Sequence, residues 1–385
     1  MSNPVLYQIN TRVWRKRFGA NTQLLDVPQT YWQQLAHLGV DFVWLMGVWQ
    51  TGPNVHRYAL APELLGGYTK ALPDWQPQDV IGSPYAIDAY ELHSDLGKKG
   101  DLLQLKARLH AVGLRLILDF VPNHFHAETR WLRERPDVFL EADEAWLARD
   151  ASTYYRPPTL PGRVFAHGKD PYFTAWQDTL QVNYAAPAAQ EFMQSQLLQI
   201  AGYCDGVRCD MAMLLLPKVI RQTWGSVLGA EQQQIADFWP NTIQTVKQQY
   251  PGFQLLAEVY WDLEWELQQQ GFDYTYDKRL LDRLHEGQVQ PIREHLWADA
   301  TFQQRSARFL ENHDEDRFLA TQHEARTKAA AMITYTTPGL RFFYQGQWEG
   351  RAKRLPVQLG REPQEQTAAN ENYAVTNAMA NLPQL

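Results

Sequence analysis

The stretch "CDGVRCDMAMLLLP", residues 204–217, has the character of a buried strand of an α/β protein, apart from two residues. Arg208 and Asp210 carry full charges in the middle of this apolar run. Side chains two positions apart lie on the same face of a strand, so these opposite charges point in the same direction. An ion pair on one face of a core strand calls for an explanation beyond packing.

The pattern on either side of this stretch predicts the fold. Short β-rich runs alternate with longer amphipathic stretches, which is typical of repeated βα units and a parallel sheet. Eight segments have strand character: 5–9, 41–49, 114–121, 204–210, 253–260, 272–277, 307–313 and 340–345. Helical patterns lie between most of them, including 99–113, 188–203 and 326–336. The sequence therefore predicts an α/β protein, a (β/α)₈ TIM barrel.

Two connections are too long for simple barrel loops, namely 50–84 and 125–183. We expect the first part of the barrel at 1–124, an inserted subdomain at 125–183 after the third strand, and the second part of the barrel at 184–350. The tail, 351–385, has room for a last barrel helix and little more, so we expect little or no C-terminal β-sandwich.

Composition excludes several classes of function. The 385 residues carry a net charge of −7 with acidic and basic residues interspersed, so we expect neither a nucleic-acid nor a membrane partner. No run of 18 apolar residues occurs and the first residues do not resemble a signal peptide, which favours a cytoplasmic location. Cys204 and Cys209 would lie roughly 16 Å apart along a strand, too far for a disulfide. Composition does not indicate an oligomeric state.

Polar residues gather at the ends of four predicted strands, where barrel enzymes place their catalytic groups. They are Asp119, Asn123 and His124 after the third strand, Arg208 and Asp210 on the fourth, Glu258 on the fifth, and Glu311, Asn312, His313 and Asp314 on the seventh. Ion pairs that cap strands would explain one such end, but four together predict a catalytic site.

The fourth and fifth strands should be neighbours, which would place the carboxyl groups of Asp210 and Glu258 about 5–5.5 Å apart. This is the spacing of a retaining glycosidase. Arg208 favours an ionised Asp210, which suits a nucleophile, whereas the apolar neighbours of Glu258 would raise its pKa and suit an acid. Asp314 would stabilise the oxocarbenium-like transition state, and His124 and His313 would donate hydrogen bonds to sugar hydroxyls.

The motifs "DFVPNH", "GVRCDMA", "AEVYW" and "ENHDED", in this order, resemble the four signature regions of the α-amylase family, glycoside hydrolase family 13, and "LQVNY" is similar to its fifth. The resemblance implies that Asp210 is the nucleophile, Glu258 the general acid/base and Asp314 the transition-state stabiliser. It places Asp119, His124, Arg208 and His313 around subsite −1, and Tyr85 as the tyrosine that stacks on the sugar there. The insertion 125–183 corresponds to the family's domain B.

The chain departs from the family pattern at two places, and one match bears on calcium. Met213 and Leu214 stand where many calcium-dependent amylases have a Lys-His pair, which weakens the expectation of a structural calcium ion. Asn123 matches a calcium ligand of the family, although it would also serve to brace its loop. Gly82 replaces an acidic residue that exo-acting relatives often carry. The chemistry itself requires no cofactor.

The leading hypothesis is a retaining hydrolase of α-glucosidic bonds in an α-glucan or a small α-glucoside. A transglycosidase, of the glucanotransferase or sugar-isomerase type, would use the same site. A metal-dependent barrel enzyme with Asp210, Glu258 and Asp314 as Mg²⁺ ligands is disfavoured, because Arg208 would repel the metal. A catalytically inactive binding protein of the same family would be expected to lose one of the three carboxylates, and all three are present.

Overall fold

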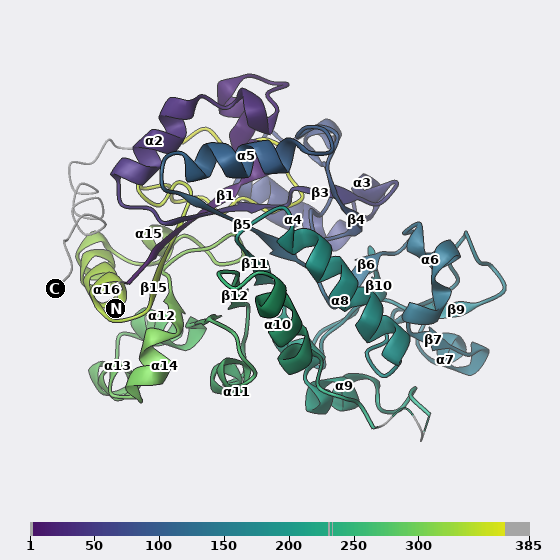
Figure 1. Ribbon diagram of the computed structural model, residues 1–385. Coiled ribbons are helices and arrows are strands. Elements are labelled where there is room, and N and C mark those ends of the chain that lie inside the picture. Colours follow the sequence, from purple (N-terminus) through teal and green to yellow (C-terminus); the bar gives the residue numbers. More distant parts are fainter. Residues whose placement is uncertain (1–2, 230–231, 233, 366–385) are drawn as a thin grey trace.

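In a computed structural model of the chain, which describes residues 3–229, 232 and 234–365, eight parallel strands close into a barrel (Figure 1). Their order around the barrel follows the sequence, and the last strand pairs with the first. The strands are β1 Val5–Asn10, β2 Phe42–Met46, β5 Arg115–Phe120, β11 Gly206–Cys209, β12 Gln254–Ala257, β13 Tyr274–Tyr276, β14 Ser306–Arg308 and β15 Leu340–Tyr344. Each coincides with one of the eight predicted segments, so the predicted TIM barrel is confirmed.

Helices surround the barrel and bury their apolar faces against the strands (Figure 1). The predicted helical stretches contain α5 Asp101–His110, α8 Pro187–Ala201 and α16 Glu324–Thr336. In α5, leucines spaced three and four residues apart are buried, and the chain turns at Gly113, whose φ of +83° suits glycine. Outside the two long connections, the further α-helices are α1 Thr11–Trp14, α2 Gln29–His37, α9 Pro217–Trp224, α10 Phe238–Gln249, α11 Glu264–Gln269, α12 Lys278–Glu286, α13 Val289–Leu296, α14 Ala300–Gln304 and α15 Phe318–Thr321.

The long connection after β5 forms a small lobe beside the barrel (Figure 1). It begins and ends on an antiparallel pair, β6 His124–His126 with β10 Thr179–Gln181, in which His124 lies opposite Gln181. Between them lie α6 Trp131–Glu134, α7 Glu144–Arg149 and a three-stranded sheet of β7 Glu141–Ala142, β9 Val164–Ala166 and β8 Tyr154–Tyr155. The lobe therefore starts four residues beyond the barrel strand that carries Asp119.

The other long connection, predicted as 50–84, contains α3 Val55–Tyr58 and α4 Pro62–Ala71, and β3 Trp49–Thr51 pairs with β4 Ile87–Leu92. Residues 351–365 lie against it without forming a helix. Leu359 is buried in an apolar cluster with Tyr68 and Leu72, and the backbone N–H of Ile81 donates to the carbonyl of Gln358 at 2.8 Å. The rest of the predicted tail, 366–385, lies outside the described residues.

Two expectations from composition concern cysteines and membrane segments. Cys204 and Cys209 are buried free thiols, as predicted. Within the described ranges, the helices are too short or too polar for any of them to cross a bilayer.

Candidate active site

Strand register brings Asp210 and Glu258 together at the carboxyl end of the barrel. Cys209 lies opposite Ala257 in the pairing of β11 with β12, and each carboxylate residue directly follows its strand. The backbone N–H of Glu258 still donates to the carbonyl of Cys209 at 3.0 Å, so the ladder continues to this point. The two carboxylates are therefore neighbours because parallel strands end at the same level.

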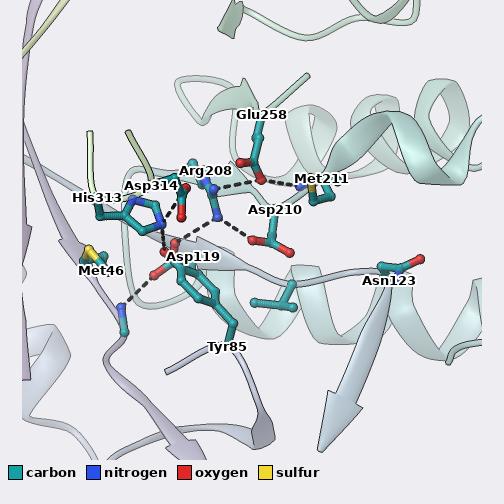
Figure 2. Close-up of polar contacts among 12 residues, drawn as sticks. Met46, Tyr85, Asp119, Asn123, Arg208, Asp210, Met211, Glu258, His313 and Asp314 are labelled. Carbon is teal, nitrogen blue, oxygen red and sulfur yellow. Dashed lines mark hydrogen bonds and ion pairs between the residues drawn. The ribbon is translucent and has the colours of Figure 1, made fainter. Parts of the chain in front are cut away.

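Arg208 connects the carboxylates of three adjacent strands (Figure 2). Its guanidinium lies 2.7 Å from Asp210 Oδ1 and 2.8 Å from Glu258 Oε2, and 3.8 Å from Asp119 Oδ1 on β5. The sequence predicted an ion pair of Arg208 with Asp210 alone. The structure adds a second ion pair, with Glu258, that is nearly as short. One buried cation is thus shared by three carboxyl groups.

Aromatic rings enclose this cation. Arg208 is 1% exposed and lies 5.1–5.9 Å from the ring centres of Trp44, Tyr85 and Tyr276. Such contacts favour a desolvated guanidinium, because the ring faces carry partial negative charge. The rings also exclude water, which strengthens every charge interaction at the end of the barrel.

Glu258 is held by one ion pair and two hydrogen bonds, which divide its two oxygens. Oε2 lies 2.8 Å from the guanidinium of Arg208 and accepts from the backbone N–H of Met211 at 2.7 Å, whereas Oε1 accepts from the hydroxyl of Tyr260 at 2.9 Å. The left-handed backbone of Met211, with φ of +42°, accompanies this N–H contact directly after Asp210. Burial raises the pKa of Glu258 to about 8 against the attraction of Arg208, and the charges of Asp210 and Asp314 raise it further.

Asp119 is a fixed part of the barrel end. Its Oδ2 accepts from the backbone N–H of Gly47 at 2.8 Å, and its Oδ1 accepts from the indole N–H of Trp44 at 3.1 Å. Burial raises the pKa of Asp119 to about 7, with Arg208 acting in the opposite direction. Both of these hydrogen bonds come from the neighbouring β2 region, and Arg208 adds an ion pair at 3.8 Å from the other side.

His313 is a neutral ring that joins Tyr85 to Asp314. Burial lowers the pKa of His313 to about 4. The side-chain amide of Gln8 donates to Nδ1 at 2.7 Å, which leaves the ring proton on Nε2, close to the hydroxyl of Tyr85 at 2.9 Å and to Asp314 Oδ2 at 3.0 Å. Both ring nitrogens therefore have protein partners, so the predicted donation to a sugar hydroxyl would require the ring to exchange one of them.

The three predicted catalytic carboxylates differ in exposure. The side chain of Glu258 is 4% exposed and that of Asp210 10%, whereas Asp314 is 41% exposed at the mouth of the barrel. Figure 2 shows Asp314 beside His313 on one side of Arg208, and Asp210 on the other. The arrangement places the carboxyl groups of Asp314 and Asp210 on either side of Arg208.

His124 and Asn123 follow β5 at the start of the lobe. His124 is buried beside Trp176, with ring centres 5.4 Å apart, and burial lowers its pKa. Asn123 points away from the carboxylates in Figure 2. Its Oδ1 accepts from the amide nitrogen of Gln181 at 3.1 Å, and the described residues include no cluster of three or more His, Cys, Asp or Glu side chains suited to a metal. With an amide donor on its side-chain oxygen, Asn123 does not fit a calcium ligand.

Sequence reasoning missed four residues that support the site. Tyr260 contacts Glu258, Trp44 contacts Asp119 and Gln8 contacts His313. The ring of Tyr276 packs on Arg208, and its hydroxyl accepts a hydrogen bond from Arg208 Nε at 3.3 Å. Tyr260 was accessible to sequence reasoning, because a side chain two residues after Glu258 shares its face in extended backbone. The other three depend on the closure of the barrel, which brings β1, β2 and β13 around β11.

Comparison with known proteins identifies the family. The family described as "Alpha amylase, catalytic domain" matches residues 31–381. "Alpha-amylase MalA" of Haloarcula japonica is 25% identical over 366 residues, covering 91% of this chain and 44% of that protein, and "Alpha-amylase 3" of Dictyoglomus thermophilum is 22% identical over 303 residues, covering 72% and 55%. The chain thus spans about half the length of these relatives.

Solved structures share the fold. The α-amylase of Lactobacillus plantarum aligns with a TM-score of 0.65 at 20% identity, over 99% of this chain and 80% of that one. The maltogenic α-amylase AmyB of Thermotoga neapolitana aligns with a TM-score of 0.68 at 20% identity, over 98% and 76%. Because the family match covers nearly the whole barrel together with its carboxylate-bearing strand ends, this chain belongs to the α-amylase catalytic-domain family.

Proposed function

We propose that this protein is a retaining glycosidase that cleaves α-glucosidic bonds of oligo- or polysaccharides through a covalent glycosyl-enzyme intermediate. One observation carries the proposal: Asp210 and Glu258 bind the same guanidinium, yet Glu258 has a pKa of about 8. A carboxyl group that holds its proton near neutral pH, beside a second carboxylate on the neighbouring strand, is what a retaining mechanism needs.

In the first half of the reaction, ionised Asp210 attacks the anomeric carbon while Glu258 protonates the leaving oxygen. Oε2 of Glu258 already accepts from the N–H of Met211 and lies 2.8 Å from Arg208, so the acidic proton belongs on Oε1, the oxygen beside the Tyr260 hydroxyl. Asp314, exposed at the mouth, would stabilise positive charge on the sugar ring as it develops.

In the second half, Glu258 acts as the base that activates water. Once Asp210 has formed an ester its charge is lost, and that charge is one of the causes that raise the pKa of Glu258. The pKa of Glu258 then falls, so the residue that gave up a proton can hold its negative charge until it accepts another from water.

The remaining predicted residues would position the sugar at subsite −1. Tyr85 lies with its ring stacked on His313 at 27° and 5.5 Å, and would be the aromatic ring on which the sugar stacks. Arg208 would hold Asp210 and Glu258 in place with Asp119 beside it, and His124 would contact the sugar from the start of the lobe. The buried free thiols Cys204 and Cys209 support a cytoplasmic location.

Transfer to a second sugar instead of water is the alternative, because both reactions share the first half. Structural neighbours are named for different substrates. One of them is a cyclic maltosyl-maltose hydrolase of Arthrobacter globiformis, which aligns with a TM-score of 0.67 at 16% identity over 98% of this chain and 82% of that one. An inactive binding protein is the third reading. It is disfavoured because the three carboxylate residues Asp210, Glu258 and Asp314 are all present at the end of the barrel.

The test is incubation with maltooligosaccharides, maltose, sucrose and trehalose, with products separated by chromatography and the first-formed anomer identified by NMR. We expect α-anomeric products from the wild type and none from Asp210→Asn. Products longer than the substrate would identify a transglycosidase. A β-anomeric first product would refute the retaining mechanism, and an inert wild type would refute the glycosidase.

A further inference from the structure

The side-chain amide of Gln181 occupies a buried position where three oxygens converge. Its Nε2 lies 3.0 Å from the carbonyl oxygen of Asn123, 3.1 Å from Asn123 Oδ1 and 3.0 Å from the carbonyl oxygen of Val182. Both Gln181 and Asn123 are buried. A single nitrogen thus ties the end of the lobe, at β10, to the chain that leaves barrel strand β5.

Three converging backbone and amide oxygens are also what a hard cation binds. Calcium takes six to eight oxygens at about 2.3–2.6 Å, whereas these contacts have the length of ordinary N–H···O hydrogen bonds. An amide nitrogen carries two N–H donors, and three acceptors satisfy both with one of them shared. The amide therefore cross-links the same oxygens without a charge and without an ion.

We infer that Gln181 does in this chain what a bound cation would do, and that the junction between lobe and barrel is independent of calcium. Gln181 is a positioning residue: it lies opposite His124 in the β6–β10 pair and holds the preceding residue, Asn123, by two contacts. The inference concerns folding of this junction and stands whether or not the proposed glycosidase activity is correct.

The orientation of the amide makes the inference testable. Gln181 Oε1 is buried and has no hydrogen-bond partner among the residues that the structure describes. If the amide were reversed, Oε1 would face three other oxygens, and the repulsion among them would require a cation. The two orientations therefore predict opposite responses to calcium.

A carboxylate at this position should create the cation site that the amide replaces. Gln181→Glu keeps the shape of the side chain but places an anionic oxygen among the three others. We expect Gln181→Glu to have a lower Tm than the wild type in chelator, and to recover most of that loss in millimolar Ca²⁺. Gln177→Glu is the matched control, since Gln177 is exposed in the same lobe and bonds to the carbonyl of Ser152.

The experiment measures Tm for the three proteins in EDTA and in Ca²⁺, together with Tb³⁺ luminescence as a direct probe of ion binding. We expect the wild type and Gln177→Glu to show the same Tm in both solutions and no saturable Tb³⁺ signal, and Gln181→Glu to show both responses. A rise in the Tm of the wild type with Ca²⁺, or saturable Tb³⁺ binding to it, would overturn the inference. A Gln181→Glu protein whose Tm does not change with Ca²⁺ would also overturn it. If Gln181→Glu does not fold, the wild-type measurements alone decide.

Discussion

Replacing Glu258 by glutamine should change how the stability of the protein depends on pH. The amide fits the existing contacts: its oxygen accepts from the N–H of Met211 and faces Arg208, and its nitrogen faces the hydroxyl of Tyr260, which turns to accept. The substitution therefore removes one titrating group and leaves its neighbours in place.

The size of the effect follows from the pKa of Glu258, about 8 in the folded protein against an ordinary value of 4.5. Between these two pH values the carboxyl is protonated in the folded state and ionised in the unfolded state. Unfolding then releases a proton, so the free energy of unfolding falls as pH rises, by about 1.4 kcal/mol per pH unit for one group. From pH 5 to pH 8 the wild type should lose on the order of 4 kcal/mol that Glu258→Gln keeps.

The assay is urea unfolding followed by tryptophan fluorescence at half-unit steps from pH 5 to pH 8. We expect the two proteins to be similar at pH 5 and Glu258→Gln to become progressively more stable towards pH 8, while losing its glycosidase activity. Leu256→Ala, two residues earlier on β12 and also buried, is the control, because a lost apolar side chain lowers stability equally at every pH. Parallel curves for wild type and Glu258→Gln would refute the assignment of Glu258 as a carboxyl that stays protonated near neutral pH.

Three further substitutions test other parts of the structure. Asp210→Asn should abolish turnover of maltooligosaccharides while the protein stays folded by circular dichroism; residual turnover near the wild-type rate would exclude Asp210 as nucleophile. Trp44→Phe removes the indole donor to Asp119 and should lower the free energy of unfolding by about 1–3 kcal/mol in urea, since a buried carboxyl oxygen loses its partner; an unchanged midpoint would contradict this. Leu359→Ala should lower it by about 2–5 kcal/mol if residues 351–365 are integral to the fold, and a neutral result would show that this segment is dispensable.

The fold was predictable because the strands are short apolar runs with a helix pattern between them. All eight strand positions came from that pattern, and the neighbouring placement of Asp210 and Glu258 came from the rule that parallel strands end at one level. The strand predicted at 307–313 is observed as Ser306–Arg308, because its pairing with β15 ends where Arg308 lies opposite Arg341.

Contacts between distant strands were not predictable from local pattern. Because Arg208 lies two residues from Asp210, the sequence alone predicted that ion pair. The contact of Arg208 with Glu258 instead depends on the rotamer that Arg208 adopts inside the closed barrel. The placement of residues 351–365 on the helices of the 50–84 connection depends on where the chain leaves β15. Neither the Arg208–Glu258 contact nor the placement of residues 351–365 produces a periodic pattern of residues, so the sequence pattern could not predict them.

The charges at the end of the barrel suggest why the acid is protonated at all. Asp119, Asp210 and Glu258 share the single cation Arg208, and all four groups are buried. Three ionised carboxylates around one guanidinium would leave an excess of negative charge among buried groups, which is strongly unfavourable. Holding a proton relieves this excess, and Glu258 is where it is held, because its pKa of about 8 exceeds the pKa of about 7 of Asp119. The pKa of Glu258 therefore depends on the number of carboxyl groups around Arg208 as well as on the burial of Glu258 itself. Any substitution that adds a second cation there should therefore lower the pKa of Glu258 and weaken it as an acid.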